Sequence, residues 1–335
     1  MKNNAFATNP PESCFIHAPC KINLHLEIGD RRPDSFHNLD SLFVSLAFGD
    51  DLFFEFSGEN GSWDLQIKNS LPSGGSSQPA GGFSGENNLI SRAVSLFREK
   101  TGLKQGIRCL LDKKIPIGAG LGGGSSDVAS TLLALNSLAK TNLSRSDLLE
   151  MAISLGSDVP FFLSGGAARA SGRGEQITPL PSPPEYPVIL VKPPFSNETA
   201  RAYRLLDQYR DSKELFLEKT LTETLRHRGR EGRGDFDYSD VWNILPCEWP
   251  FFNDFLGVLP ESEVYREILA GLRKEGAEFA GLSGSGSCCF GVFADRERAM
   301  TAQKKLVFDN MLGKNGLNFI QITFFLASAA IPVLK

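Results

Sequence analysis

The sequence has no excess of basic residues. Its 335 residues include 35 Lys and Arg against 39 Asp and Glu, which gives a formal net charge of −4. A chain with this balance offers no broad electrostatic footprint for nucleic acid or for an anionic membrane, so we expect neither as a partner. Any basic site must therefore be local, as a phosphate pocket is.

Histidine is scarce and C-x-x-C pairs are absent. The six cysteines are scattered along the chain without a C-x-x-C pair, and the four histidines show no spacing of the H-E-x-x-H kind. In a chain of this length, scattered cysteines indicate reduced thiols and an intracellular protein, and the histidines supply no candidate zinc site.

Long apolar runs are lacking as well. The stretch Phe319–Leu334 is apolar, but it covers about 16 residues and contains Gln321 and Pro332. A membrane-spanning helix needs about 20 apolar residues, so a buried strand is the better interpretation. The N-terminal residues hold no sustained apolar run, which argues against a signal peptide. We expect a cytoplasmic protein.

The length is sufficient for two domains, each with its own core. The proline-rich stretch Pro179–Pro184 is the strongest candidate linker. We therefore expect an N-terminal domain over 1–182 and a C-terminal domain over 183–335. The second half alternates helical and strand patterns from Ser262 to Ala327, which predicts an α+β sandwich with helices on one face of a sheet. Two polar segments, 70–85 and 226–240, are predicted to be surface insertions.

One glycine-rich loop has the chemistry of a phosphate site. It runs from Pro116 to Ser126 as P-I-G-A-G-L-G-G-G-S-S, and a small-residue helix is predicted after it. Glycines allow backbone N–H groups to approach a phosphate, and the helix N-terminus favours negative charge. The two serines can cap the helix, contact phosphate or ligate Mg²⁺.

Three other interpretations of this loop are open. Gly118-x-Gly120-x-x-Gly123 fits a dinucleotide fingerprint formally, but that motif follows a strand directly and is followed by an acidic strand end. A Walker A loop needs Gly-Lys-Ser/Thr, and Gly124 stands where the lysine would be. A merely flexible loop is the third possibility, although so many glycines carry an entropic cost.

The segment resembles the P-x-x-x-G-L-G-S-S signature of GHMP kinases. Three further motifs are Ala18–Leu26 with Asp34–Leu39, Leu155–Phe161, and Gly281–Ser287. Taken with these, the chain resembles the family of 4-diphosphocytidyl-2-C-methyl-D-erythritol kinases over almost its whole length. This resemblance implies an α+β, two-domain GHMP kinase fold, with an N-terminal ribosomal-protein-S5-domain-2-like domain and a C-terminal ferredoxin-like α/β sandwich. It also implies ATP as phosphoryl donor, Mg²⁺ as cofactor and CDP-methylerythritol as substrate.

The first further motif is Ala18–Leu26 with Asp34–Leu39. It is similar to the family's A-x-K-x-N-L-x-L and D-G-Y-H-x-L elements and implies a catalytic role for Lys21. A lysine with its stem on the surface is the alternative, but an unpaired ammonium in an apolar strand is costly. The resemblance further implies that His37 hydrogen-bonds the cytosine and that Phe36 stacks on it, whereas a lone histidine is more often structural. Asn23 is placed at the substrate.

The second further motif, Leu155–Phe161, is similar to the family's G-A/S-D-V-P-F element. A turn aspartate is the ordinary interpretation of Asp158, but the resemblance places its carboxylate beside the substrate hydroxyl. Lys21 would then pair with Asp158 and with the γ-phosphate. Asp158 would accept the proton of the 2-hydroxyl or orient that group; the sequence leaves both open.

The third further motif, Gly281–Ser287, resembles a loop that faces the phosphates from the C-terminal domain, against the alternative of a plain hairpin turn. Tyr203 would be the second aromatic residue at the cytosine, with Thr199 nearby. The residues that the resemblance places at the ATP site are Asn88, Leu89, Lys113, Pro116, Gly118, Gly120, Leu121, Gly122, Gly123, Gly124, Ser125, Ser126, Ser283, Gly284, Ser285 and Gly286. Ser126 is the predicted Mg²⁺ ligand.

Two alternative functions remain open at this level. One is another GHMP kinase, acting on homoserine, mevalonate or a sugar, and the other is a non-catalytic nucleotide-binding protein on the same fold. The aromatic residues at the predicted cytosine site favour the cytidine substrate, and Lys21 with Asp158 argues for catalysis. We expect a monomer or a weak homodimer.

Overall fold

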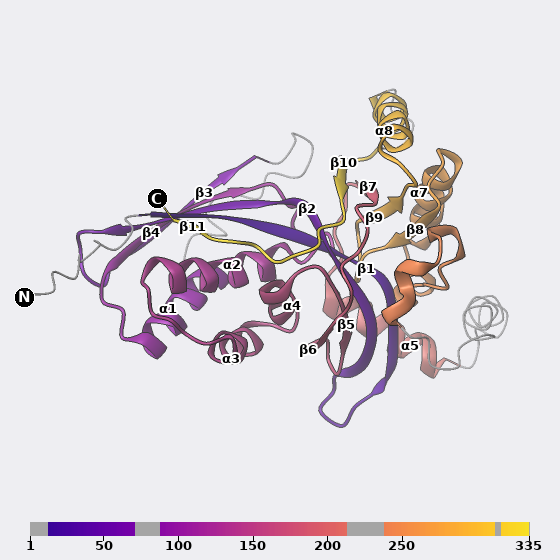
Figure 1. Ribbon diagram of the computed structural model, residues 1–335. Coiled ribbons are helices and arrows are strands. Elements are labelled where there is room, and N and C mark those ends of the chain that lie inside the picture. Colours follow the sequence, from indigo (N-terminus) through magenta and orange to yellow (C-terminus); the bar gives the residue numbers. More distant parts are fainter. Residues whose placement is uncertain (1–12, 71–87, 213–237, 312–315, 335) are drawn as a thin grey trace, which may run out of the picture.

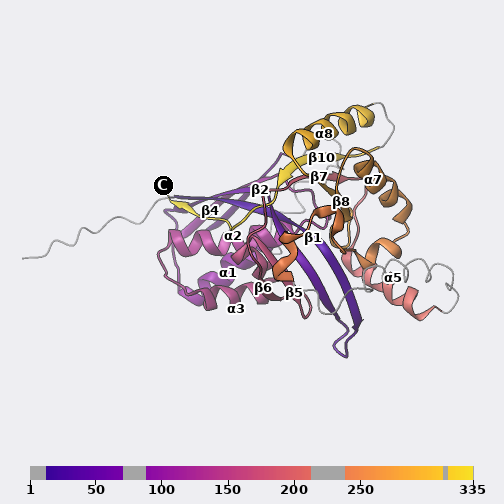
Figure 2. The same cartoon turned by 45° about the vertical axis from the view of Figure 1, so that its right-hand side comes forward.

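The computed structural model describes residues 13–70, 88–212, 238–311 and 316–334. Within these residues the chain forms a seven-stranded sheet and a four-stranded sheet, each accompanied by helices. In both views α1 to α4 lie on one side of the molecule and α5, α7 and α8 on the other, with the long strands β1 and β2 extending between them (Figure 1, Figure 2).

The seven-stranded sheet has the order β11-β1-β2-β4-β3, with β5 paired to β2 and β6 paired to β5. Its pairs are antiparallel except for β3 and β4, which are parallel. The strands are β1 (Ser13–Arg31), β2 (His37–Ser57), β3 (Trp63–Asn69), β4 (Gly106–Lys113), β5 (Ala167–Ser171), β6 (Gln176–Pro179) and β11 (Val333–Leu334).

The strand β2 is continuous, although a polar segment around Gly49 separates its apolar stretches Ser41–Leu46 and Asp51–Phe56. The polar break near Gly49 is a register shift and not a turn: Pro19 pairs with Gly49, whereas the next residue of β1, Cys20, pairs with Leu46. A Cβ at position 49 would lie 2.2 Å from the Ala18 carbonyl oxygen, so glycine permits the close approach of the two strands. The glycine therefore bends the ribbon without ending it.

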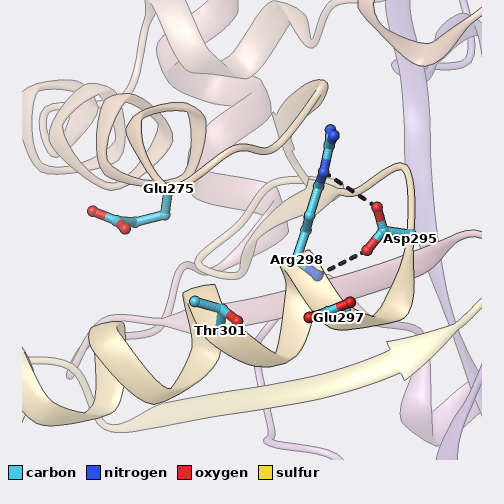
Figure 3. A pocket seen from close by; sticks show the side chains of 5 residues that line it. All are labelled: Glu275, Asp295, Glu297, Arg298 and Thr301. Atoms are coloured by element: carbon cyan, nitrogen blue, oxygen red, sulfur yellow. Dashed lines mark hydrogen bonds and ion pairs between the residues drawn. The ribbon is translucent and has the colours of Figure 1, made fainter.

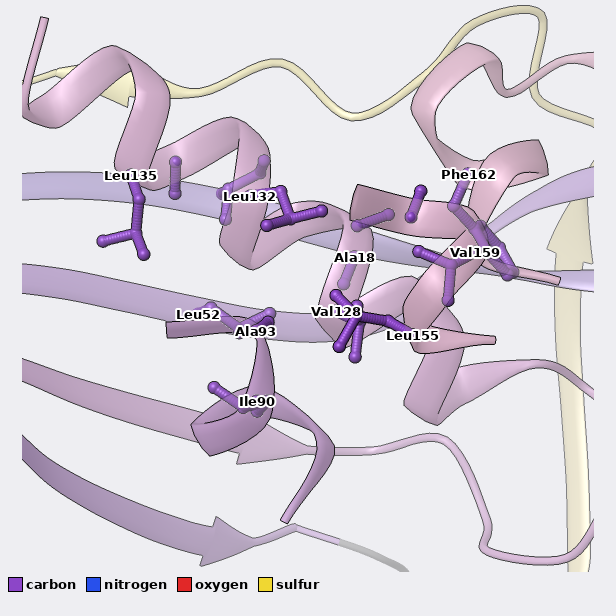
Figure 4. Close-up of a cluster of buried hydrophobic side chains, with 14 of the residues drawn as sticks. Ala18, Leu52, Ile90, Ala93, Val128, Leu132, Leu135, Leu155, Val159 and Phe162 are labelled. Atoms are coloured by element: carbon purple, nitrogen blue, oxygen red, sulfur yellow. The ribbon is translucent and has the colours of Figure 1, made fainter. Parts of the chain in front are cut away.

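Four helices cover one face of this sheet: α1 (Leu89–Thr101), α2 (Gly123–Leu138), α3 (Arg145–Leu155) and α4 (Val159–Ser164). Alternate residues of the strands, such as Leu52, point into the same cluster as Val128 and Leu132 of α2 and Ile90 of α1 (Figure 4). Full burial of each such side chain stabilises the fold by roughly 1.5–3 kcal/mol. The side chains of Asn88 and Ser144 cap the N-termini of α1 and α3.

The four-stranded sheet is antiparallel with the order β10-β7-β9-β8. Its strands are β7 (Pro187–Lys192), β8 (Phe279–Leu282), β9 (Cys289–Val292) and β10 (Phe319–Phe324), and its helices are α5 (Thr199–Asp211), α7 (Ser262–Lys274) and α8 (Arg296–Met311). The short 3₁₀ helices η2 (Tyr238–Asn243), η3 (Pro246–Glu248) and η4 (Asp254–Gly257) precede α7.

The two faces of this second sheet bury different partners. Ile189 and Val191 of β7 face the helices, in one cluster with Leu269 of α7. Val188 and Leu190 face the other way, in a cluster that also contains residues of β1 and β2. The predicted strand Phe319–Ala327 is β10, and helices do cover one face of the sheet. The opposite face packs against the first sheet, which joins the two halves through a common core.

The end of the chain returns to the first sheet. Phe325 bridges to Leu46, and Val333 and Leu334 pair with the start of β1. The expected boundary at 182/183 stays a prediction. Of the predicted insertions at 70–85 and 226–240, residues 71–85 and 226–237 lie outside the described residues. No helix in the described part of the chain is long and apolar enough to cross a membrane.

Candidate functional site

The phosphate loop connects β4 to α2, and its shape depends on glycine. Gly118, Gly120 and Gly122 have φ of 63°, 75° and 70°, in the left-handed region that other residues seldom adopt. A Cβ on Gly120 would lie 2.1 Å from the carbonyl oxygen of Ser283, and one on Gly122 would lie 3.0 Å from Cγ of Lys21. Gly122 is the N-cap of α2 and supplies no side-chain cap, so the first N–H groups of this helix remain available to an anion.

The second glycine loop, which connects β8 to β9, lies against the first. The Ser283 hydroxyl donates to the Gly120 carbonyl oxygen at 2.9 Å, and the Cys288 amide donates to the Ala119 carbonyl oxygen at 3.1 Å. Asn253 holds the same loop from η4, because its amide donates to the carbonyl oxygens of Leu282 and Gly284, both at 2.8 Å. The structure thus brings together two loops that are about 160 residues apart in the sequence.

Lys21 and Asp158 meet beside the phosphate loop. The Lys21 Nζ lies 3.5 Å from Asp158 Oδ2; the lysine side chain is 5% exposed and the aspartate side chain 32%. Lys21 projects from β1, where its backbone N–H donates to the carbonyl oxygen of Leu121 in the loop. Asp158 occupies the N-cap position of α4 without capping it. The carboxylate therefore faces both the buried ammonium and solvent, as a group that contacts a substrate must.

A chain of buried side chains fixes the Lys21 ammonium. Lys21 Nζ donates to Asn23 Oδ1 at 2.6 Å, the Asn23 amide donates to the Ser41 hydroxyl at 2.8 Å, and that hydroxyl donates to the His25 carbonyl oxygen at 2.5 Å. The Phe43 ring lies 4.8 Å from Lys21 Nζ and adds a cation–π contact. Sequence reasoning missed Ser41 and Phe43, because their contact with β1 depends on the register of β2.

The predicted cytosine-site residues fall into two groups. His37 stacks on Tyr203, with ring centroids 5.1 Å apart and an interplanar angle of 20°. The Phe36 side chain points elsewhere: it is 52% exposed, and the Arg173 guanidinium lies 4.9 Å from its ring centroid. Burial raises the pKa of Tyr203 to about 12, so its hydroxyl stays protonated near neutral pH. The structure thus brings His37 to Tyr203, with the Phe36 ring outside that stack.

Asp207 is a further member of this group that sequence reasoning missed. His37 Nε2 lies 2.8 Å from Asp207 Oδ1, so the carboxylate orients the imidazole. Asp207 lies one helical turn beyond Tyr203 on α5, which places both on one face. The helix α5 is not among the elements predicted from the sequence, and therefore no helical spacing connected Asp207 with Tyr203.

Thr199 contacts the second glycine loop. Its hydroxyl lies 3.0 Å from the Ser285 hydroxyl, and the Asn197 amide donates to the Ser285 carbonyl oxygen at 2.8 Å. Thr199 is the first residue of α5, the helix that also carries Tyr203. The start of α5 therefore links the loop predicted for ATP to the residues predicted for the substrate.

The residues predicted to shape the adenine site have different surroundings. Asn88 Oδ1 caps α1 by accepting from the Ile90 amide at 2.8 Å. Leu89 is 37% exposed, and its Cδ1 lies 3.4 Å from the position of a Cβ on Gly124, so it borders the phosphate loop. The Lys113 ammonium pairs with two carboxylates: its Nζ lies 2.6 Å from Asp50 Oδ2 and 2.7 Å from Asp127 Oδ2.

The two serines at the start of α2 differ in access. Ser126, the predicted Mg²⁺ ligand, is fully buried, and its hydroxyl has no hydrogen-bond partner. That hydroxyl does not fit a metal ligand in this conformation, whereas Ser125 is only half-buried. No group of three or more His, Cys, Asp and Glu residues suited to a metal occurs in the described part of the chain. Mg²⁺ held largely by nucleotide phosphates needs no such group.

A shallow pocket elsewhere carries no comparable chemistry. It is lined by Glu275 at the end of α7 and by Asp295, Glu297, Arg298 and Thr301 around the start of α8 (Figure 3). Asp295 accepts from the Arg298 amide at 2.8 Å and pairs with its guanidinium at 3.2 Å, so the central charges are already satisfied. It contains none of the predicted site residues.

Comparison with known proteins matches both halves of the chain. Residues 88–166 match the family model "GHMP kinases N terminal domain" and residues 250–310 match "GHMP kinases C terminal". The first match contains the phosphate loop and Asp158, and the second contains the Gly281–Ser287 loop. The α+β fold with two GHMP domains, expected from the sequence, is confirmed.

Curated relatives of similar length carry one enzyme name. A 4-diphosphocytidyl-2-C-methyl-D-erythritol kinase from Prochlorococcus marinus strain AS9601 is 35% identical over 314 residues, which cover 90% of this chain and 91% of the relative. One from Thermodesulfovibrio yellowstonii is 35% identical over 285 residues, with 85% and 91% covered.

Solved structures agree with these relatives. A crystal structure of 4-(cytidine 5'-diphospho)-2C-methyl-D-erythritol kinase superposes with a TM-score of 0.67 at 31% identity and covers 93% of this chain and 98% of its own. A homoserine kinase from Cytophaga hutchinsonii also superposes with a TM-score of 0.67, covering 99% of this chain and 100% of its own, but at 17% identity. The second likeness shows the fold alone.

Proposed function

Since the chain belongs to the family of 4-diphosphocytidyl-2-C-methyl-D-erythritol kinases, we propose that its site transfers the γ-phosphoryl group of ATP to the 2-hydroxyl of CDP-methylerythritol. The chain is a small-molecule kinase. The observation that carries the proposal for the site is the Lys21–Asp158 pair, 3.5 Å apart beside the phosphate loop. An ammonium and a carboxylate at that place are what a phosphoryl transfer to an alcohol requires.

The donor side rests on the two glycine loops. The uncapped start of α2 offers backbone N–H groups and a favourable helix dipole to the ATP phosphates. The Gly281–Ser287 loop packs on Gly120 from the other half of the molecule, and Leu89 borders the same loop. The dinucleotide, Walker A and flexible-loop interpretations of the loop are set aside, because the family match is to kinases of the GHMP type.

The acceptor side rests on Asp158 and Lys21. Asp158 accepts the proton of the 2-hydroxyl or orients that hydroxyl for in-line attack. Lys21 neutralises charge on the transferred phosphoryl group and lies 3.5 Å from the Asp158 carboxylate, whose negative charge it balances. Its low exposure strengthens both effects, because a buried charge is poorly screened. Asn23 holds the ammonium in place, because its Oδ1 accepts from Lys21 Nζ at 2.6 Å.

The cytidine end of the substrate is assigned to the group around α5. His37 and Tyr203 supply hydrogen bonding and a ring face for the base, and Asp207 orients His37. Phe36 is exposed and is therefore free to move onto the base when the substrate binds. Thr199, at the start of α5, stands between this group and the second glycine loop.

The finer assignments follow from the same proposal. Ser125 is the protein group that would contact a Mg²⁺ ion bound with ATP, and the ion would supply charge neutralisation for the phosphates. We assign the protein to the cytoplasm, as a monomer or weak homodimer, with no nucleic-acid or membrane partner. A relative from Oryza sativa is named as chloroplastic, so location differs within the family.

One assay tests the substrate assignment. The purified chain is incubated with ATP and Mg²⁺, and ADP release is followed with CDP-methylerythritol, mevalonate or homoserine as acceptor. We expect turnover with the cytidine compound alone. Turnover with mevalonate or homoserine at comparable kcat/KM would assign the chain to another GHMP activity. ATP binding without ADP release on any acceptor would indicate a non-catalytic nucleotide-binding protein.

A further inference from the structure

A buried cluster of one lysine and two aspartates lies beside the phosphate loop. Lys113 Nζ is 2.6 Å from Asp50 Oδ2 and 2.7 Å from Asp127 Oδ2, and the three side chains are 12%, 0% and 5% exposed. One lysine thus serves two carboxylates. Burying charges is expensive even when they are paired, so the cluster is weak as a device for stability alone. Its position next to the phosphate loop indicates a second role.

The cluster joins the two ends of the phosphate loop. At the start of the loop, Asp50 Oδ1 accepts from the backbone amides of Lys114 and Ile115 at 2.6 and 2.8 Å. At its end, Asp127 belongs to α2, one residue beyond Ser126. Lys113 bridges the two carboxylates and thereby ties the residues before Pro116 to the helix that follows the loop.

The backbone at Gly123, the first residue of α2, lies close to this cluster. A Cβ on Gly123 would lie 3.2 Å from Lys113 Nζ and 2.9 Å from Cγ2 of Ile115. The Lys113 ammonium therefore lies close to the backbone at the start of α2. That backbone carries the N–H groups assigned to the ATP phosphates.

Direct contact between Lys113 and ATP is the competing interpretation. Two of the three ammonium protons already point to carboxylates, and the side chain is largely buried. Movement toward a ligand would leave two carboxylates buried without their cation, which is a strongly unfavourable state. The geometry thus favours a role through the loop and not at the nucleotide.

We propose that Lys113, Asp50 and Asp127 form a clamp that holds the phosphate loop in its ATP-binding conformation. The clamp deepens the proposed function and rests on it. A loop rich in glycine loses much conformational freedom when it becomes ordered. The clamp orders the loop before ATP arrives, so that binding does not bear this cost. The three side chains are positioning residues and contact neither substrate.

The test replaces part of the clamp by apolar side chains of similar size. Lys113→Met combined with Asp127→Leu removes the bridge and leaves Asp50 with its two backbone donors. Lys114→Met is the matched control, because the neighbouring Lys114 ammonium pairs with Asp51 at the surface and not with the clamp. For each full-length protein, ATP binding is measured by calorimetry, and hydrogen exchange by mass spectrometry over residues 116–126.

We expect the double variant to bind ATP at least tenfold more weakly and to exchange faster over the loop, with KM for the alcohol substrate within twofold of wild type. The Lys114 control should match wild type in all three. Asp127→Asn, which keeps the Lys113–Asp50 pair, should stay folded and weaken ATP binding to a smaller degree. ATP affinity within twofold of wild type in the folded double variant would overturn the clamp.

Two further outcomes would also decide whether the clamp proposal holds. An equal rise in KM for both substrates, or loss of the folded state in both clamp variants, would overturn the proposal, because the cluster would then support the fold in general. Failure of wild type to bind ATP would instead contradict the proposed function. Measuring ATP binding by the wild-type protein therefore distinguishes failure of the proposed function from failure of the clamp proposal.

Discussion

The Lys21 ammonium is 3.5 Å from the Asp158 carboxylate but only 2.6 Å from Asn23 Oδ1. The lysine is thus anchored by a neutral amide and faces the carboxylate across a longer gap. An arrangement of this kind leaves the carboxylate open to a substrate hydroxyl while its charge stays compensated. Catalytic hydrogen bonds are often long before substrates bind and shorten in the reacting complex.

The Ser41 hydroxyl should matter for catalysis through Asn23. Ser41→Ala removes the group to which the Asn23 amide donates, so Asn23 is freer to turn away from Lys21. We expect kcat to fall roughly tenfold with the fold intact, a size consistent with small misplacements in active sites. Steady-state kinetics and an unfolding midpoint measure both effects.

Ser45→Ala is the control for this prediction. Ser45 lies four residues after Ser41 in β2 and is equally buried, but its hydroxyl has no hydrogen-bond partner. Its removal should change kcat less than twofold. If both variants lost activity to the same extent, the Ser41 effect would reflect packing of β2 and not the position of Asn23.

His37→Ala should damage recognition of the cytidine substrate. The change removes the ring that stacks on Tyr203 and the partner of Asp207. We expect KM for CDP-methylerythritol to rise about tenfold or more, the loss of one good polar contact, with KM for ATP nearly unchanged. Equal increases in both KM values would place His37 in the fold and not in the pocket.

Gly120→Ala should separate the two glycine loops. The new Cβ would lie 2.1 Å from the Ser283 carbonyl oxygen, at a residue whose φ is 75°. We expect ATP affinity to fall at least tenfold, because the loop must shift away from its partner. Calorimetric titration with ATP gives the change directly.

Gly61→Ala separates this clash from backbone strain. Gly61 has nearly the same φ, 77°, but a Cβ there would meet no atom within 4 Å. This variant should lose some stability and keep its ATP affinity. Equal losses of ATP affinity in the two variants would show that strain, and not the contact between loops, explains the Gly120 result.

The sequence predicted what local patterns encode. The strand pattern that begins at Phe319 and the glycines of the phosphate loop follow from nearby residues, and the structure has a strand over Phe319–Phe324 and positive φ angles in the loop. The resemblance to a known family supplied the pairing of Lys21 with Asp158, which no spacing rule predicts.

The missed features depend on long-range contacts. Asp50 and Asp127 reach Lys113 only because β2 pairs with β4 and α2 packs beneath them. The helix α4 directly follows Asp158, has six residues and contains Pro160 near its start, so no helical pattern is recognisable in its sequence. These contacts are determined by strand register and by the packing of segments that are far apart in the chain. Local sequence patterns do not predict them.

The most direct test of the account is kcat for Asp158→Asn with ATP and CDP-methylerythritol. The amide keeps the size of the side chain but neither accepts a proton nor balances the charge of Lys21. We predict at least a ~10²-fold loss of kcat, the range of a lost general base, with ATP affinity and the unfolding midpoint close to wild type. Turnover within threefold of wild type would contradict the central role given to the Lys21–Asp158 pair.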